Sequence, residues 1–209
     1  GKVTHGDSMG NSGTIGPGDV QWMTAGSGII HQEMPTGDNK NFMCGFQLWA
    51  TLPASHKMMP PRYRDVSAGS IPEVKADGGA TIKIICGEIS GVKGPVRDIV
   101  IEPEFLDIAL PPGCGYRRPA KKGHTVFAYV IGGGGTMGGQ DVADETLVLF
   151  EDGDAISAEA GGAAMRFLLI SGKPLKEPVA WRGPIVMNTR EELATAFEEY
   201  ENGSFIKHK

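Results

Sequence analysis

The 209-residue sequence has few cysteines, no long apolar run and no excess of positive charge. Its three cysteines, Cys44, Cys86 and Cys114, stand far apart without a CxxC pair, so neither a disulfide framework nor a thiolate zinc site is indicated, and a reducing compartment is expected. Twenty Lys and Arg residues against 25 Asp and Glu residues give a net charge of −5, so nucleic acid is not expected as a direct partner. With neither a membrane span nor a signal-peptide core, we predict a soluble cytoplasmic protein, or a nuclear one in a eukaryote.

Glycine and proline, by contrast, are abundant, with 31 and 14 residues spread along the chain between short apolar runs. This pattern is typical of a loop-rich all-β protein, and the spacing of the runs favours sandwiches or small barrels. Trp22 and Trp49 stand in two of these runs and are predicted to lie in the core. The predicted strands are 20–24, 28–33, 44–51, 81–87, 96–101, 104–110, 125–131, 146–150, 154–158 and 164–171.

Two stretches depart from the strand pattern. Residues 55–74 begin rich in proline and positive charge, with Lys57, Arg62 and Arg64, and predict an exposed linker between two halves. Near the other end, Thr189 precedes Glu192 by three residues, which is a capping-box pattern. Apolar residues then recur at helical spacing, so an amphipathic helix is predicted over 190–201. The recurring residues are Leu193, Ala196, Phe197 and Tyr200.

A histidine and a glutamate interrupt the apolar strand in the segment GDVQWMTAGSGIIHQEMP. Alternate residues of a strand point to one face, so Ile29, His31 and Glu33 are expected to share a side. Imidazole and carboxylate together are the donors that non-haem iron and similar metals bind. A hydrogen-bonded pair at the mouth of a barrel is the structural alternative, and the residues alone leave both interpretations open.

The two halves of the sequence look like copies. A Gly-Asp pair begins a similar glycine-spaced stretch at positions 18 and 153, and an apolar strand follows each. Aligning position 18 with position 153 places Arg166 opposite His31 and Leu168 opposite Glu33. The second copy is therefore predicted to lack the candidate metal ligands.

Three segments closely resemble the pirin family of bicupins: GPGDVQWMTAGSGIIHQEMP, GFQLWATLP at 45–53, and SGKPLKEPVAWRGPIVMNTREEL at 171–193. The resemblance implies two cupin barrels, each a double-stranded β-helix or jelly roll, with a transition metal in the first. It implies an N-terminal cupin domain over 1–64, a C-terminal cupin domain without ligands over 75–185, and a helix and tail over 186–209.

In this family three histidines and one glutamate hold the metal, and His31 and Glu33 match the last two of these ligands. The first two form an HxH pair on strands that precede the segment VTHGDSMG, and this sequence begins at Gly1 just before that segment. His5 matches a family histidine that is not a ligand. We therefore expect an incomplete first barrel with a remnant of the metal site.

The resemblance also implies function. Bacterial members resemble quercetin 2,3-dioxygenases, so Fe(II) or another divalent metal, a flavonol and O2 are the expected cofactor and substrates, with Glu33 as general base. Vertebrate members act as nuclear cofactors of transcription regulators, which gives the alternative of a non-enzymatic module that binds a protein partner. A third interpretation is a degenerate, metal-free cupin whose exposed strand edges are covered by self-association.

Overall fold

The computed structural model describes residues 1–40 and 42–208 and divides the chain into two compact units. The first unit is discontinuous and joins Gly1–Ala68 to Leu175–Lys209, whereas the second is formed by Gly69–Pro174. The sequence-based division instead ended the C-terminal domain at residue 185. The segment that follows Pro174 returns to the first unit because its side chains bond there: Glu177 Oε2 accepts from the Ala54 amide at 2.7 Å.

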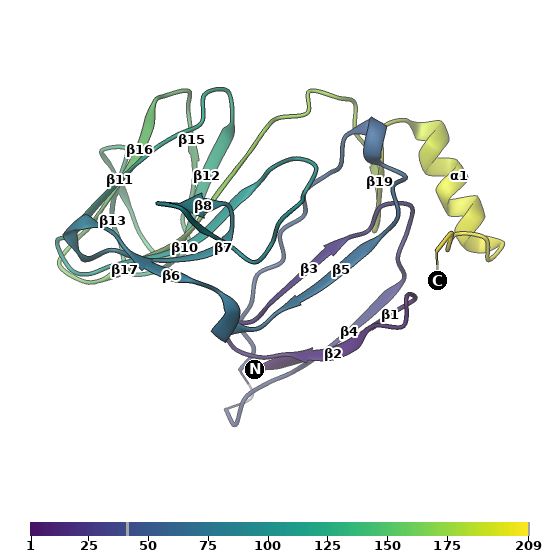
Figure 1. The fold of residues 1–209 in the computed structure, drawn as a ribbon, viewed down its shortest axis with the longest axis horizontal. Helices are drawn as coiled ribbons and strands as arrows, with labels where there is room; N and C mark the ends of the chain where they lie inside the picture. The colour runs from purple at the N-terminus through teal and green to yellow at the C-terminus, as the bar shows by residue number, and fades with distance from the viewer. Residues whose placement is uncertain (41, 209) are drawn as a thin grey trace. The chain divides into compact units, whose positions relative to one another are not determined.

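Strands make up nearly all of the regular structure, which confirms the predicted all-β fold with one C-terminal helix (Figure 1). Among the described residues, no helix is long and apolar enough to cross a membrane. In the first unit the elements are β1 (Lys2–Asp7), β2 (Ser12–Ile15), β3 (Val20–Thr24), β4 (His31–Thr36), the 3-10 helix η1 (Ala54–His56), β5 (Arg62–Val66), β18 (Ala180–Arg182), β19 (Ile185–Met187) and α1 (Arg190–Glu201).

The second unit contains most of the strands. Its elements are β6 (Glu73–Lys75), η3 (Asp77–Gly79), β7 (Thr81–Cys86), β8 (Glu88–Ile89), β9 (Val92–Lys93), β10 (Glu104–Leu110), β11 (Gly115–Pro119), β12 (Thr125–Gly132), β13 (Gly135–Met137), β14 (Gln140–Val142), β15 (Leu147–Phe150), β16 (Ala155–Ala160) and β17 (Met165–Gly172); η2 (Ala68–Ser70) spans the boundary.

Two antiparallel sheets enclose the core of the second unit, one in the order β15-β12-β17-β10-β7-β6 and the other in the order β11-β16-β13-β14. Alternation along β10, where every second residue is apolar and buried, produces this arrangement. The fully buried side chains are aliphatic or aromatic, with Phe167 the largest of them. The interior of this unit is therefore a packed apolar core.

The first unit has two smaller sheets, β2-β1-β4 and the pair β3-β5, besides the short hairpin β18-β19 (Figure 1). Residues on β1 alternate, so that Val3, His5 and Asp7 lie on the face that contacts β5 through the His5 ring. His5 is the buried residue of β1, and all six residues of β4 are exposed. The candidate metal ligands His31 and Glu33 therefore lie on a strand, β4, that does not pack in a core.

The helix agrees with its prediction at both ends. The Thr189 hydroxyl accepts from the Glu192 amide at 3.1 Å, and the Glu192 carboxylate accepts from the Thr189 amide at 2.9 Å. Leu193 and Ala196 are buried, as the apolar face requires. The capping box thus fixes the start of α1 at Arg190.

Several predictions differ from the structure. Residues 44–51 and 96–101 contain no strand in the part of the chain that the structure describes, and Trp49 is 55% exposed rather than in the core. The predicted linker 55–74 does contain the boundary between the two units, after Ala68, but it is not an exposed linker throughout, because it includes β5, which pairs along its whole length with β3. Alternation and charge indicate which faces are buried or solvated, but pairing depends on a partner strand elsewhere in the chain.

Lys57 also departs from the prediction of a solvated linker. Its side chain is buried, and Nζ donates to the Thr51 hydroxyl at 2.6 Å. Burial lowers the pKa of Lys57, and the nearby carboxylates of Glu177 and Glu192 oppose that effect. Lys57 therefore belongs to the contacts that hold the C-terminal segment within the first unit.

Candidate metal centre and its polar neighbours

His31 and Glu33 lie on β4, next to β1 in the ladder. The antiparallel register places Glu33 directly opposite His5 and His31 directly opposite Asp7. Residues that face each other across such a ladder share one side of the sheet, with Cβ atoms about 4.5–5.5 Å apart. The strand therefore presents His31 and Glu33 on the same face as His5, which is the face toward β5.

The two predicted site residues are close together. His31 Nδ1 lies 3.6 Å from Glu33 Oε1, and each side chain is 33% exposed. One imidazole nitrogen and one carboxylate oxygen at this separation are beyond a hydrogen bond but within reach of a common cation. Their partial exposure leaves both groups accessible to a ligand from solvent.

The donor set fits a transition metal in kind but not in number. No group of three or more His, Cys, Asp or Glu side chains suited to a metal occurs within residues 1–40 and 42–208. His31 and Glu33 supply two donors, whereas mononuclear sites with exchangeable positions commonly use three or more protein ligands. Any remaining ligands must come from groups other than the described side chains.

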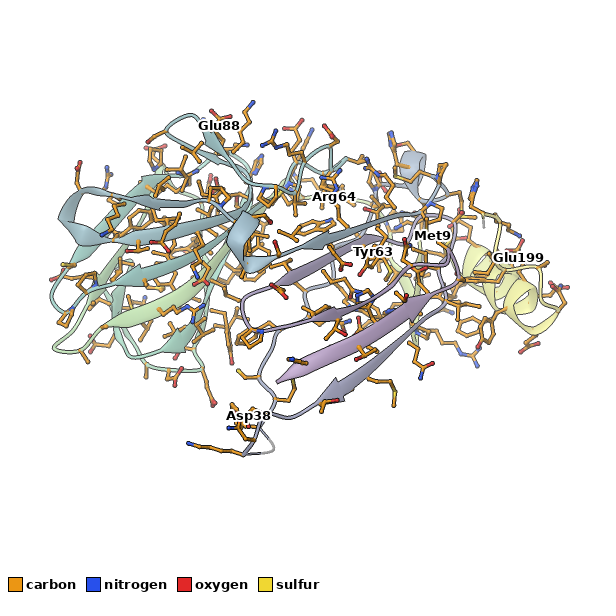
Figure 2. The ribbon with its side chains drawn as sticks, turned by 60° about the horizontal axis from the view of Figure 1, so that its bottom comes forward. Met9, Asp38, Tyr63, Arg64, Glu88 and Glu199 are labelled. Atoms are coloured by element: carbon orange, nitrogen blue, oxygen red, sulfur yellow. The ribbon has the colours of Figure 1, made fainter. Side chains whose placement is uncertain are left out.

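A hydrogen-bond network that the sequence did not reveal adjoins this pair. Tyr63, labelled in Figure 2, lies on β5. Its hydroxyl lies 2.9 Å from His5 Nε2 and 3.1 Å from Nδ1. It also accepts from Gln21 Nε2 at 3.1 Å and donates to Asp65 Oδ1 at 2.5 Å. We call these four residues, Gln21, His5, Tyr63 and Asp65, the Tyr63 network.

The donor inventory of the Tyr63 network fixes its direction. An ionised carboxylate only accepts, so the single proton of the Tyr63 hydroxyl is donated to Asp65, and the oxygen must accept from both Gln21 and His5. Burial raises the pKa of Tyr63, and the hydrogen bond to Asp65 adds to that rise. Tyr63 therefore stays neutral and continues to donate to Asp65 across the ordinary pH range.

Asp7 shapes the turn between β1 and β2. Its carboxylate accepts from the Met9 amide at 2.9 Å and from the Asn11 amide and side chain at 3.0 and 2.8 Å. Burial favours the neutral form, but these hydrogen bonds outweigh it and lower the pKa of Asp7. Asp7 is thus occupied in holding the turn rather than free beside His31.

The loop that leads into β4 is fixed from three sides. Ser8 bonds the backbone of Ile30, through its amide at 2.8 Å and its hydroxyl at 3.1 Å. The Ser27 amide donates to the Met59 carbonyl at 2.9 Å. Gly28 has a φ of +133° and a Cβ there would lie 2.7 Å from the Phe205 ring, so only glycine fits. These contacts determine where β4 begins.

The position that the sequence repeat places opposite His31 has a different chemistry. Arg166, on β17, donates to both carboxylate oxygens of Asp107 at 2.8 and 2.6 Å and is about half exposed. Leu168, opposite Glu33 in the repeat, is buried. The second unit also has an open groove of about 630 Å³ on its smaller sheet, lined by Asp77, Arg117 and Glu159 among others, which contains neither predicted ligand.

Sequence reasoning found the pair but missed the network. His5 and Tyr63 are 58 residues apart, so no local spacing joins them. The alternation of Val3, His5 and Asp7 was an available signal, because it marks His5 as an inward residue of a strand.

Comparison with known proteins agrees with this architecture. The family model described as pirin matches residues 1–50, and that of the pirin C-terminal cupin domain matches residues 105–206. A pirin-like protein of Caulobacter vibrioides is 40% identical over 98% of this chain and 74% of its own length, and human pirin is 39% identical over 97% and 70%. A crystal structure of quercetin 2,3-dioxygenase from Acinetobacter baumannii has a TM-score of 0.84 and 31% identity, covering 98% of this chain and 73% of that one. The chain therefore belongs to the pirin family and has its cupin fold.

Proposed function

We propose that this chain is an oxidoreductase of the quercetin 2,3-dioxygenase type, which cleaves a flavonol with O2 at a divalent metal such as Fe(II). The observation on which the proposal depends is the His31 and Glu33 pair, one imidazole and one carboxylate 3.6 Å apart on one face of β4. The similarity to the Acinetobacter baumannii enzyme supports this reaction class. Both residues would contribute ligands, and the metal would supply a Lewis-acidic centre for the flavonol oxygens and O2.

Glu33 is also the proposed general base. Its carboxylate is 33% exposed, which lets a substrate hydroxyl approach it, and β4 holds its backbone in the ladder with β1. A carboxylate at hydrogen-bond distance from a flavonol hydroxyl can accept its proton and so activate the ring toward oxidation. The proton acceptor Glu33 and the metal ligand His31 would then lie side by side on β4.

Metal content and flavonol oxidation test the proposal together. The full chain, purified without chelator, is compared with His31→Ala, Glu33→Ala and the control Gln32→Ala, whose side chain lies between the pair but on the other face. We expect a bound metal in the wild type and the control, its loss in the other two, and O2-dependent loss of quercetin absorbance that follows metal content. Protein supplied with Fe(II) that neither retains metal nor consumes quercetin would contradict the proposal.

Self-association is a second candidate property, and one surface feature favours it. Large apolar side chains in the irregular segment 42–49 are exposed by 40–63%: Phe42, Met43, Phe46, Leu48 and Trp49. Exposed apolar surface is what association removes from water. Light scattering of the purified chain is expected to give a dimer mass that Phe46→Ser with Trp49→Ser converts to a monomer. A monomer mass for the wild type at all concentrations would exclude this property.

A further inference from the structure

The strand that holds His31 and Glu33 has little to fix it in place. All six residues of β4 are exposed, and β4 is an edge strand whose one neighbour among the described strands is β1. No apolar side chain of β4 is buried, so packing does not hold it. Its position therefore depends on β1 through the ladder from Lys2–Thr36 to Asp7–His31.

β1 in turn is held by one buried side chain. His5 is 5% exposed, while the other residues of β1 are exposed or half-buried. The His5 ring contacts the Tyr63 hydroxyl at 2.9 Å, and its Nε2 lies 3.5 Å from Asp65 Oδ1. Both partners are on β5, so this contact joins the sheet β2-β1-β4 to the pair β3-β5.

The register of the β1–β4 ladder places this contact next to Glu33. His5 is the residue directly opposite Glu33 in the ladder, so the point where β1 is fixed is the point where the proposed general base stands. Gly13 lies on the other side of His5, and a Cβ there would come within 2.8 Å of His5 Nε2. The ring therefore lies between β2 and β5, and glycine at position 13 leaves the space that the ring occupies.

We propose that Tyr63 is a positioning residue for Glu33 and His31: its hydroxyl holds His5, and His5 holds β1 and the facing residues of β4 at a fixed place relative to β5. The inference rests on the proposed function for its role in metal binding, but its structural content, the dependence of β4 on the Tyr63 hydroxyl, does not. Removal of groups that orient metal ligands commonly costs about 10- to 100-fold in metal affinity or activity.

Tyr63→Phe tests the inference because it keeps the ring and removes the hydroxyl alone. Ni(II), which is stable in air, is titrated into the metal-free full chain well below its melting temperature. We expect affinity to fall about 10-fold relative to the wild type. The control Thr14→Val, on the outer face of the same sheet where Thr14 contacts Thr4 at 3.5 Å, should leave affinity unchanged. A merely structural hydroxyl would lower the melting temperature and leave the affinity of the folded protein as it was.

Conservative replacement at His5 gives a second measurement. His5→Gln retains an N–H donor for Tyr63 and is expected to keep affinity within a few-fold of the wild type, whereas His5→Phe should match Tyr63→Phe. The double variant with Phe at both positions should be no weaker than either single variant, because residues in one network act as a unit. Additive losses would overturn the inference.

Hydrogen exchange separates this inference from the proposed function. In metal-free protein, the β4 amides should exchange about 10-fold faster in Tyr63→Phe than in the wild type, and Thr14→Val should show no such change. If the wild type binds no Ni(II), the proposed metal site fails, and the exchange rates alone decide the positioning role. Unchanged β4 exchange in Tyr63→Phe contradicts the inference whatever the metal result.

Discussion

The two units differ most in what fills the space between their sheets. In the second unit, apolar side chains from β7, β10, β12 and β17 meet in a cluster from which water is excluded. In the first unit, the two small sheets meet at the buried His5 and the half-buried Tyr63, and the carboxylates of Asp65 and Glu33 beside them are partly open to solvent. A closed apolar interior stabilises a fold but leaves no group for chemistry, whereas a polar interior retains reactive groups and gives up hydrophobic stabilisation.

The edges of the two units show the same contrast. The central strands of the second unit have neighbours on both sides, as β17 does between β10 and β12. The strand with the candidate ligands has one described neighbour and no buried residue. The difference teaches that the second unit is organised around an apolar core and the first around specific polar contacts.

The largest effect is expected in the apolar interior. Phe167→Ala removes the largest fully buried side chain and should lower the free energy of unfolding by about 3–5 kcal/mol. Denaturant unfolding followed by circular dichroism measures this loss. A cost under about 1 kcal/mol would mean that the core repacks and that the contrast between the units is weaker than described.

A smaller effect is expected at the helix of the first unit. Thr189→Ala removes the hydroxyl that accepts from the Glu192 amide and should cost about 1 kcal/mol. The same unfolding measurement detects it, with Thr195→Ala as the control, since that hydroxyl bonds within the helix to the Glu191 carbonyl. Equal costs for the two variants would show that the cap does not matter to the first unit.

A pH-dependent effect is expected at Asp7. Because its pKa is lowered in the folded protein, ionised Asp7 contributes stability that is present above the ordinary pKa of 3.8 and is lost as pH falls through the lower folded value. Asp7→Asn should therefore be less stable than the wild type near neutral pH, by less than about 1 kcal/mol because water screens this largely exposed carboxylate, and close to it in strong acid. A difference that stays constant from pH 7 to pH 2 would contradict this origin.

The smallest effect is expected on the exposed apolar segment. Phe46→Ser changes a side chain that is 55% exposed, so the unfolding free energy of the dilute protein should change by less than about 0.5 kcal/mol. Comparing its unfolding free energy with that of Phe167→Ala contrasts an exposed phenylalanine of the first unit with a buried phenylalanine of the second. A large cost for Phe46→Ser would show that this surface is covered in solution.

The parts of the fold that local sequence determines were predicted well. The strand 104–110 has the predicted bounds because its alternation Phe-Leu-Asp-Ile-Ala-Leu matches the two faces of a sheet. The start of the helix 190–201 was predicted because a capping box is a local contact. Segment 44–51 alternates as well, yet it pairs with no described strand, because a strand needs a partner that local composition does not specify.

The candidate site also has one part that the local sequence predicts and one part that it does not. That His31 and Glu33 share a face followed from their spacing of two residues, and the structure places their side chains 3.6 Å apart. Their role as metal ligands stays a prediction. The contact between His5 and Tyr63 depends on two sheets meeting, which no pattern within either segment encodes.

The discontinuity of the first unit has a consequence for the order of folding during synthesis. A ribosome releases Gly69–Pro174 as one uninterrupted stretch, so the second unit has all of its strands before Leu175–Lys209 has been made. The first unit must wait, because Phe205 contacts Gly28 and Glu177 bonds Ala54 only after residues 175–205 have emerged. Contacts between residues far apart in the sequence form slowly. The loop before β4 therefore gains its Phe205 contact only after the second unit has been released.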